Sequence, residues 1–407
     1  MLLPKQFTDM KQTSPFLLIV EEVKVDGVDV GPTEISISYD EGGKLLLSFE
    51  IDYSPEVISE ECEIQVKYKA DSEPLGIFLT ERSLSFENAK VAVEARFFRE
   101  PVVLIDRPSS KRFEAVLLSG PKFLSKTIIL FDGNGTKFEI DPFKSEEGAS
   151  CLIKSDINLK AKSPLEPLEP ILDFLTFAKG SYCGLGNLFT YDEDDSVAFR
   201  LVGFSRNDRE KRVGNWFDIE IQNDLPEIFL LFSAASTDEL TKRALRQTIA
   251  FYRASNASRS VSIEMSIIAA HTALEAIVNY TLAYRAGWSK SLLNNRTIAF
   301  ADKNRAAALH FGIHNDLLSQ SPRLAKYSKE KGDIDLFEII SQIRNKLVHQ
   351  DNNKILNGIQ LHETWLAAQW LVEILIFGVI GYRGAMMDRR IYSGWRGTTY
   401  KVPLGHS

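Results

Sequence analysis

The sequence predicts an α+β protein, with a β-rich N-terminal region followed by an all-α helical bundle. Short segments that alternate apolar and polar residues, with turn residues between them, fill the first 160 positions. This pattern is typical of strands. Segments with helical periodicity follow from about residue 227. The length of 407 residues exceeds that of a typical single core, so we expect two or three domains.

Residues 1–160 are expected to form a β-rich domain with a sandwich or barrel-like fold. Residues 35–39 alternate apolar and polar side chains, and residues 45–51 return after an Asp-Glu-Gly-Gly turn. Residues 64–68 alternate in the same way. Residues 127–140 hold two apolar runs around Asp-Gly-Asn-Gly, which predicts a hairpin. Several short strands with turns between them favour a sandwich or a barrel.

Residues 161–228 are expected to contain a linker helix and further strands that complete the N-terminal region. Three prolines punctuate the start of this segment. Residues 171–178 are predicted to form a short helix that Gly180 stops. Strands are predicted at residues 197–201 and 216–221.

Residues 229–407 are expected to form a helical bundle that ends in a basic aromatic tail. Shorter helices are predicted between residues 286 and 330. Residues 366–382 are the most apolar part of the chain, but they include Gln369 and Glu373, which favours a buried helix over a membrane helix. The main predicted helices cover residues 238–252, 260–284, 333–349 and 363–382.

The net charge of −7 is unevenly distributed along the chain. Residues 236–407 hold 22 basic against 14 acidic residues, a net charge of +8, and residues 1–235 hold 26 against 41, a net charge of −15. The basic half suits a polyanionic partner, although a solvated surface without a partner gives the same count.

The cysteines and the N-terminus indicate a cytoplasmic protein. Three cysteines lie far apart without a CxxC pair, which argues against a disulfide framework or a zinc site and for a reducing compartment. The N-terminal residues lack the apolar run of a signal peptide. We therefore expect no membrane association.

Arg344, Asn345 and His349 form the clearest candidate for chemistry. An arginine holds phosphate through a fixed fork of donors, and a histidine moves protons near neutral pH. On an ideal helix Asn345 and His349 lie about 40° apart, whereas Arg344 and His349 lie about 140° apart. Either the helix ends near His349 or a second chain completes the site. The alternative is structural, because Arg and His near a helix C-terminus also complement its dipole.

This Arg-Asn-x-x-x-His stretch resembles the R-x4-6-H signature of HEPN domains, in which a polar residue commonly follows the arginine. The upstream segment 271–280 resembles the "ALEA" helix of Apea-like HEPN proteins. The order of β-rich region, Leu-Pro junction and helical bundle is similar to that of the ApeA anti-phage proteins. The helical resemblance covers about residues 230–385, and the N-terminal likeness is one of architecture only.

The resemblance implies a metal-independent endoribonuclease without a cofactor, in which RNA is cleaved by attack of its own 2′-hydroxyl. His349 would act as general acid or base, Arg344 would stabilise the phosphoryl oxygens, and Asn345 would orient either group. The implied partners are tRNA or mRNA, a second copy in a homodimer, and a phage-derived trigger sensed by the N-terminal region. The alternatives are a non-catalytic RNA-binding or dimerisation module, and an effector subunit of a larger defence complex.

Further residues are weaker candidates. Glu275 follows His271 by four positions, so the pair lies on one helix face and is a candidate for orienting the catalytic groups. His310 and His314 have the spacing of a metal-binding pair but lack further ligands, so we expect no metal site. The tail interleaves cations and aromatic residues, which suits single-stranded RNA but equally suits packing against the N-terminal domain. The RNA-binding candidates are Lys346, Arg389, Arg390, Trp395 and Arg396.

Overall fold

The computed structural model describes most of the chain, in two compact units that each draw on several stretches of sequence. The described residues are 16–39, 45–52, 63–67, 77–80, 85–87, 90–97, 102–118, 124–145, 148–204, 214–313, 317–349, 357–391 and 397–405. The first unit, here called the sheet unit, comprises Met1–Pro121, Phe138–Pro167 and Gly184–Asn207. The second, here called the helical unit, comprises Lys122–Lys137, Leu168–Cys183 and Asp208–Ser407.

The first sheet of the sheet unit is antiparallel, with the strand order β1-β4-β5-β9-β7-β6-β2-β3 and β8 beside β9. Successive side chains along its strands point to opposite faces of the sheet. Ile64 and Val66 of β6 share one face and are fully buried. The strands predicted at 35–39, 45–51 and 64–68 correspond to β4, β5 and β6. The strands are β1 (Phe16–Val20), β2 (Glu22–Val25), β3 (Val28–Asp29), β4 (Thr33–Tyr39), β5 (Leu45–Asp52), β6 (Glu63–Lys67), β7 (Ile77–Thr80), β8 (Ser85–Glu87) and β9 (Lys90–Phe97).

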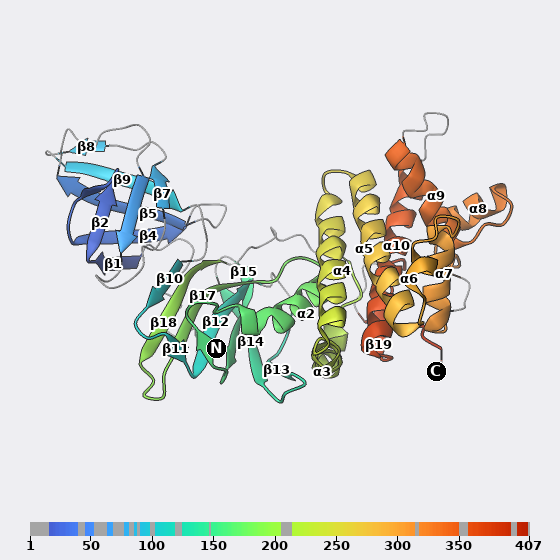
Figure 1. Ribbon diagram of the computed structural model, residues 1–407, viewed down its shortest axis with the longest axis horizontal. Coiled ribbons are helices and arrows are strands. Elements are labelled where there is room, and N and C mark those ends of the chain that lie inside the picture. The colour runs from blue at the N-terminus through green and yellow to red at the C-terminus, as the bar shows by residue number, and fades with distance from the viewer. Residues whose placement is uncertain are drawn as a thin grey trace. The chain divides into compact units, whose positions relative to one another are not determined.

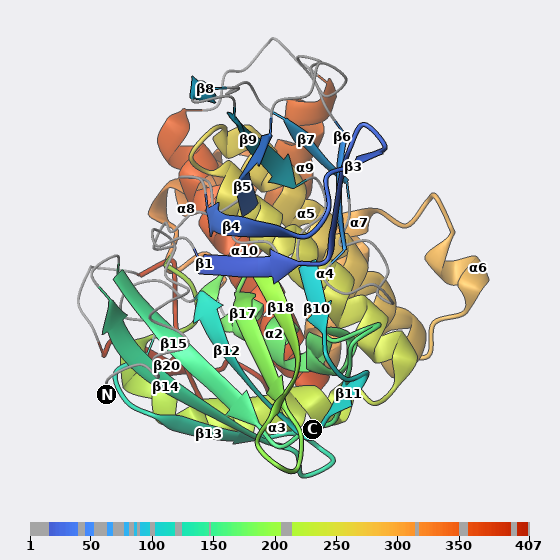
Figure 2. The same ribbon diagram turned by 90° about the vertical axis from the view of Figure 1, so that its left-hand side faces the viewer.

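The second sheet joins strands that precede helix α2 (Glu169–Lys179) in the sequence with strands that follow it. In the sheet unit its order is β10-β18-β17-β12-β15-β14, and Figure 2 shows these strands side by side. Leu185 of β17 lies opposite Leu117 of β12, and both side chains are fully buried. The strands are β10 (Val102–Ile105), β12 (Arg112–Leu118), β14 (Lys137–Ser145), β15 (Gly148–Ser155), β17 (Gly184–Tyr191) and β18 (Val197–Phe204), with β11 (Ser109–Ser110) and β16 (Leu159–Lys160) paired separately.

Strand β13 (Ile128–Phe131) belongs to the helical unit, where it packs on α3 (Leu225–Ala235). The turn after β13 is anchored there, because the Gly133 backbone N–H donates to Ser233 Oγ at 2.9 Å. The Asp-Gly-Asn-Gly stretch is therefore a turn between two strands, as its sequence predicts.

Helix α2 (Glu169–Lys179) also belongs to the helical unit and confirms the predicted helix with its glycine stop. Gly180 adopts φ 76°, and its N–H donates to Thr176 O at 2.9 Å. A side chain at Gly180 would be strained in this conformation and would begin 3.0 Å from Asn215 Nδ2. Glycine is thus required both by the backbone and by the close approach of Asn215.

The strand predicted at residues 216–221 is wrong, because a 3₁₀ helix η3 (Ile219–Asp224) starts there. Asp218 begins this helix by accepting a hydrogen bond from the Glu220 backbone N–H at 2.9 Å. Trp216 is fully buried and donates from Nε1 to Phe177 O at 3.0 Å. Its apolar character therefore serves tertiary packing rather than a strand face.

The helices of the C-terminal region confirm the predicted α+β class. Asp238 and Ser262 accept hydrogen bonds from backbone N–H groups at the starts of α4 and α5, as good N-cap residues do. Figure 1 shows α4, α5 and α10 side by side in the helical unit. The helices are α4 (Glu239–Ser258), α5 (Ile263–Tyr280) with a π-helical turn η4 (Thr281–Arg285), α6 (Lys290–Leu293), α7 (Phe300–His310), α8 (Pro322–Glu330), α9 (Leu336–His349) and α10 (Gly358–Ile380).

Helix α10 is the central element of the helical unit. Among the described residues, α10 is the one helix that is long and apolar enough to cross a membrane. However, 83% of its most apolar stretch is buried inside the protein. Asn357 caps its start and Gly381, with φ 80°, ends it. These features fit a buried core helix, as predicted from its embedded Gln369 and Glu373.

Candidate functional site

Helix α9 positions Arg344 and Asn345 next to its buried apolar face. Asp335 accepts a hydrogen bond from the Glu338 backbone N–H at 2.9 Å near the start of the helix. Ile340 and Ile343 are almost completely buried and fix the helix rotation. The next position, Arg344, is therefore half-buried, and Asn345 is exposed.

The Arg344 guanidinium retains hydrogen-bonding capacity. Its Nη1 donates to Asn345 Oδ1 at 3.2 Å. Its Nε is buried and has no hydrogen-bond partner among the described residues. A buried donor without a partner costs free energy, so it needs an explanation, of which a bound molecule, ion or water is one.

A carboxylate on α5 lies near this arginine. The buried His271 places Nδ1 3.4 Å from Glu275 Oε1, which is longer than a strong hydrogen bond. The contact with His271 chiefly holds the pKa of Glu275 below its usual range, and the charges of Arg344 and Lys303 add to this effect against partial burial. The Glu275 carboxylate therefore sits among groups contributed by α5, α7 and α9.

His271 is held in place by α7 as well as by its own helix. Its ring centroid lies 4.5 Å from that of Phe300, in a tilted arrangement. One turn further along α7, Asn304 is 1% exposed, and its Oδ1 has no hydrogen-bond partner among the described residues. Packing of α5, α7 and α9 thus brings together residues that the sequence separates by up to 73 positions.

The predicted site is described only in part. The structure places four of the predicted residues as described above, namely Arg344, Asn345, Glu275 and His271. The backbone of α9 is described as far as His349, but the side chain of His349 lies outside the described residues. Lys303 was not singled out from the sequence, because nothing in its local pattern indicates that α7 packs beside Glu275.

Lys346 faces a different neighbour from Arg344. Two helical positions rotate a side chain by about 200°, so the two cations point to opposite sides of α9. Lys346 Nζ donates to Tyr327 OH of α8 at 2.9 Å and lies 5.4 Å from the centre of that ring. Lys346 is therefore tied to α8 and is not a neighbour of Arg344.

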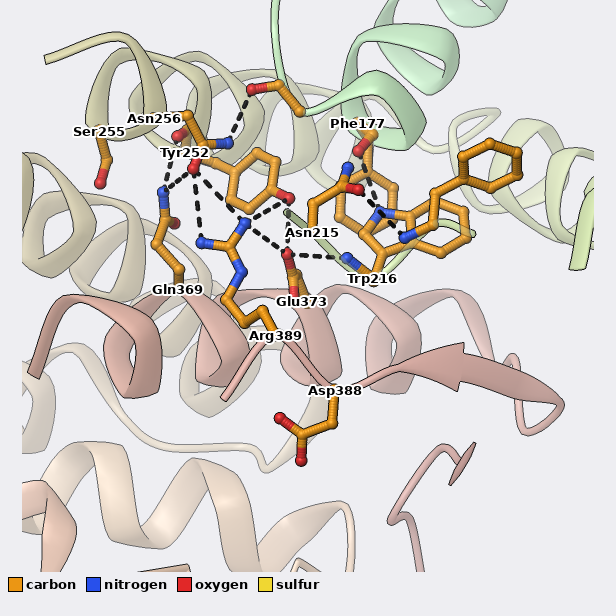
Figure 3. A network of polar contacts seen from close by, with 12 residues as sticks. Phe177, Asn215, Trp216, Tyr252, Ser255, Asn256, Gln369, Glu373, Asp388 and Arg389 are labelled. Carbon is orange, nitrogen blue, oxygen red and sulfur yellow. Dashed lines mark hydrogen bonds and ion pairs between the residues drawn. The ribbon is translucent and has the colours of Figure 1, made fainter. Parts of the chain in front are cut away.

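Arg389 is a core residue, and its predicted role as an RNA-binding surface residue is wrong. Its side chain is 0% exposed and forms an ion pair with Glu373 of α10, with Nη2 and Oε1 3.0 Å apart. Figure 3 shows this pair inside a network of polar side chains. An arginine closed off in this way cannot reach a phosphate.

The network around Glu373 supplies several donors to one carboxylate oxygen. Tyr252 OH donates to Glu373 Oε1 at 2.6 Å, and the Trp216 backbone N–H donates to the same oxygen at 3.3 Å. Gln369 and Asn256 extend the network towards α2, where Asn256 Nδ2 donates to Gly180 O at 2.7 Å. Burial raises the pKa of Glu373 to about 7, against the lowering charge of Arg389.

Arg390 is also engaged by the fold, which again corrects the surface prediction. Its Nη2 lies 2.7 Å from Asp388 Oδ2, and its guanidinium carbon lies 3.5 Å from the centre of the Trp370 ring. Its side chain is 7% exposed. Trp395 and Arg396, the other two tail candidates, lie outside the described residues.

The remaining candidates do not form a metal site in the part of the chain that the structure describes. No group of three or more His, Cys, Asp or Glu side chains in these ranges could hold a metal ion. Between β17 and β18, residues 192–195 are all acidic, and arginines compensate them, with Arg107 2.5 Å from Asp192 and Arg112 2.9 Å from Asp195. His310 is exposed, and His314 lies outside the described residues.

Comparison with known proteins gives one family match. A family model for the YopA C-terminal domain matches residues 238–400, which are less than half of the chain. The match begins at Asp238, the N-cap residue of α4, and contains Arg344, Asn345 and His349. No curated protein and no solved structure gives a significant match. Over residues 238–400 the chain is thus similar to the YopA C-terminal domain.

Proposed function

We propose that the helical unit is a HEPN-type, metal-independent endoribonuclease with Arg344, Asn345 and His349 at its active site. The observation that carries the proposal is the state of Arg344, whose buried Nε has no partner among the described residues and whose charge acts on the Glu275 carboxylate of α5, a helix that packs on α9. A guanidinium held near a carboxylate with a donor to spare suits recognition of a phosphodiester.

The proposed reaction needs two proton transfers and stabilisation of charge on phosphorus oxygens. The RNA 2′-oxygen bonds to phosphorus, the bond from phosphorus to the 5′-oxygen breaks, and the products are a 2′,3′-cyclic phosphate and a 5′-hydroxyl. His349 serves as general acid or base, and Arg344 stabilises the charged phosphoryl oxygens. Asn345 orients the reacting groups, and Glu275, itself contacted by His271, holds Arg344 in position.

The working form is proposed to be a homodimer joined through the helical unit. Arg344 and His349 lie about 140° apart around an ideal helix, so one copy of α9 does not aim both at one phosphate. A two-fold axis places the arginine of one copy near the histidine of the other. Mixing Arg344→Ala chains with His349→Ala chains tests this arrangement, because a shared site regains part of the activity.

The proposed setting is anti-phage defence in the cytoplasm, with tRNA or mRNA as the substrate and the sheet unit as the sensor or regulator. The support is the resemblance to Apea-like HEPN proteins, together with the net charge of +8 over residues 236–407. Cells that express the full chain should resist phage plating, and cells that express His349→Ala should not. Equal plating on both strains contradicts this setting.

Incubation of the full chain with tRNA and mRNA in the presence of EDTA tests the nuclease itself. Wild type should cleave without a metal, and Arg344→Ala and His349→Ala should not. Mapping of the product ends should identify a 2′,3′-cyclic phosphate and a 5′-hydroxyl. Cleavage at the wild-type rate by homogeneous His349→Ala contradicts the proposal.

A further inference from the structure

A second arginine–histidine pair, formed by Arg259 and His362, lies at one end of the helical unit. Arg259 follows the last residue of α4, and His362 lies in the second turn of α10. Figure 1 shows the α4–α5 turn and the first turns of α10 at the same end of the helical unit. Arg259 Nη2 lies 3.2 Å from His362 Nδ1, so this contact connects the two helices directly.

Both members of the pair rest on Trp365. The rings of His362 and Trp365 are stacked, with centroids 5.8 Å apart and planes 24° apart. The Arg259 guanidinium carbon lies 5.0 Å from the Trp365 ring centre. Trp365 is 4% exposed, so it supports the pair from below and leaves Arg259 exposed and His362 half-exposed.

The pair offers hydrogen-bond donors without acceptors. A guanidinium only donates, so a hydrogen bond from Arg259 requires the lone pair of His362 Nδ1 and leaves the imidazole proton on Nε2. Burial, and then the charge of Arg259, lower the pKa of His362, in agreement with a neutral ring. The remaining guanidinium N–H groups and the Nε2–H are then available to an acceptor.

No carboxylate compensates this charge among the described residues. Arg259 takes part in no ion pair there, whereas Arg389, which also lies 5.2 Å from the centre of the Trp365 ring, is neutralised by Glu373. The acid nearest in sequence to His362 is Glu363, whose Oε2 accepts backbone N–H groups at the start of α8 at 2.9 and 3.0 Å. The positive charge at Arg259 is therefore free to attract an anion.

We propose that Arg259 and His362 form a phosphate-binding subsite that holds a backbone phosphodiester of single-stranded RNA away from the bond that is cut. The planar fork of arginine matches phosphate oxygens, and the histidine Nε2–H supplies one more donor. The choice of RNA as the source of the phosphate rests on the proposed nuclease function. Trp365 is too deeply buried to stack on a base, so the subsite reads the backbone and not the sequence.

Binding of a non-cleavable RNA tests the subsite. The probe is a fluorescein-labelled, fully 2′-O-methylated oligonucleotide, whose affinity for the full chain is measured by anisotropy over a series of salt concentrations. Arg259→Gln should weaken binding severalfold and lower the salt slope by about 0.7, the value for one phosphate contact on a single strand. His362→Gln should weaken binding less, and Arg259→Lys should retain the salt slope but part of the affinity only.

Arg243 provides the matched control. It is exposed on the same helix, 16 residues before Arg259 and so roughly 24 Å away. Arg243→Gln should leave affinity and slope at wild-type values. Equal weakening by Arg243→Gln and Arg259→Gln overturns the subsite, because it would show diffuse attraction. The thermal unfolding midpoints of all variants are measured as well, and those of Arg259→Gln and Arg259→Lys should stay close to the wild-type value.

Further measurements distinguish a free phosphate ion from an RNA phosphate as the ligand, and distinguish failure of the subsite from failure of the nuclease proposal. Inorganic phosphate and unlabelled RNA are each tested for displacing the labelled oligonucleotide. If millimolar inorganic phosphate displaces it as well as the same concentration of RNA phosphate does, Arg259 and His362 bind a free anion and the RNA subsite is overturned. Unchanged RNA binding in Arg259→Gln, with cleavage still lost in His349→Ala, overturns the subsite and leaves the nuclease standing. Loss of binding in Arg259→Gln, with no cleavage by wild type, supports the subsite and overturns the nuclease.

Discussion

Arg389 and Arg344 are both arginines of the helical unit, and their surroundings differ in almost every respect. Arg389 is fully buried, with Glu373 3.0 Å away and Tyr252 within the same network. Arg344 is half-buried, donates to Asn345, and keeps Nε without a partner among the described residues. Because Nε of both arginines lacks a partner among the described residues, burial and a paired carboxylate, and not the residue type or a left-over donor, separate an arginine that stabilises the fold from one available to a substrate.

The same difference extends to the cost of each arginine. A fully buried ion pair needs its partner, because removal of one member leaves a charge in a medium that solvates it poorly. The charge of Arg344 acts on Glu275, whose side chain is 40% exposed, so water screens much of that interaction. We therefore expect substitutions at Arg389 to lower mainly the stability of the fold and substitutions at Arg344 to lower mainly the rate of cleavage.

The largest expected effect is on catalysis by Arg344→Ala. Loss of a group that stabilises transition-state charge typically lowers the rate by about 10²–10³-fold. The free energy of unfolding should change by only about 0.5 kcal/mol, as for substitutions outside the core. Cleavage rates and urea denaturation of the same preparation check both expectations. A large loss of stability would place Arg344 with Arg389.

Arg389→Ala should have the opposite profile. It leaves the Glu373 carboxylate buried without its ion-pair partner, which should destabilise the protein by roughly 3–5 kcal/mol. The double variant Glu373→Gln with Arg389→Met should recover much of this loss, because it removes both charges and fills the space. Urea denaturation of the single and double variants measures the coupling, and strictly additive losses would argue against the pair.

The pH dependence of stability sharpens the comparison. Burial raises the pKa of Glu373 from 4.5 to about 7, so between these values the folded chain holds a proton that the unfolded chain has released. This contribution is fully present below about pH 4.5 and is lost as pH rises through about 7. The free energy of unfolding should fall by up to roughly 3 kcal/mol over this range. The Glu373→Gln and Arg389→Met double variant should have a flatter profile, and an identical profile would contradict the assignment.

The smallest expected effect is that of Glu275→Gln. An electrostatic interaction between partly exposed groups is worth at most about 1 kcal/mol, so the variant should lower kcat by no more than about fivefold with little change in KM. In the Arg344→Ala background the same substitution should have no further effect, because Glu275 acts through Arg344. Glu264→Gln, in the exposed first turn of α5, serves as the control. An equal loss with and without Arg344 would show that Glu275 is only structural.

Local patterns predicted most of the fold because they are set by nearby residues. The short helix predicted over 171–178 with Gly180 as its stop is observed as α2, and the backbone requires the glycine there at φ 76°. The strand predicted at residues 216–221 was wrong, because the apolar side chain of Trp216 packs on Phe177 and does not belong to a strand face. Tertiary packing and a buried strand give the same local signal.

The candidate site was predictable in its parts but not in its assembly. His271 and Glu275 share a helix face by spacing alone, yet only the packing of α5 on α9 brings Arg344 to them. Glu373 stood out as a charge in an apolar helix, which indicates a buried partner without naming it. Arg389 was misplaced, because interleaved cations and aromatic residues occur both on RNA-binding surfaces and in stacked cores.

Dependence of cleavage on the RNA 2′-hydroxyl is the decisive test of attack by the 2′-oxygen on phosphorus. The full chain is given an oligoribonucleotide that it cleaves, and then the same sequence with a single 2′-deoxy substitution at the mapped position. Cleavage at that position should disappear in EDTA while binding affinity is retained. Cleavage of both oligonucleotides at the same rate would contradict a mechanism in which the 2′-oxygen attacks phosphorus with the help of Arg344 and His349.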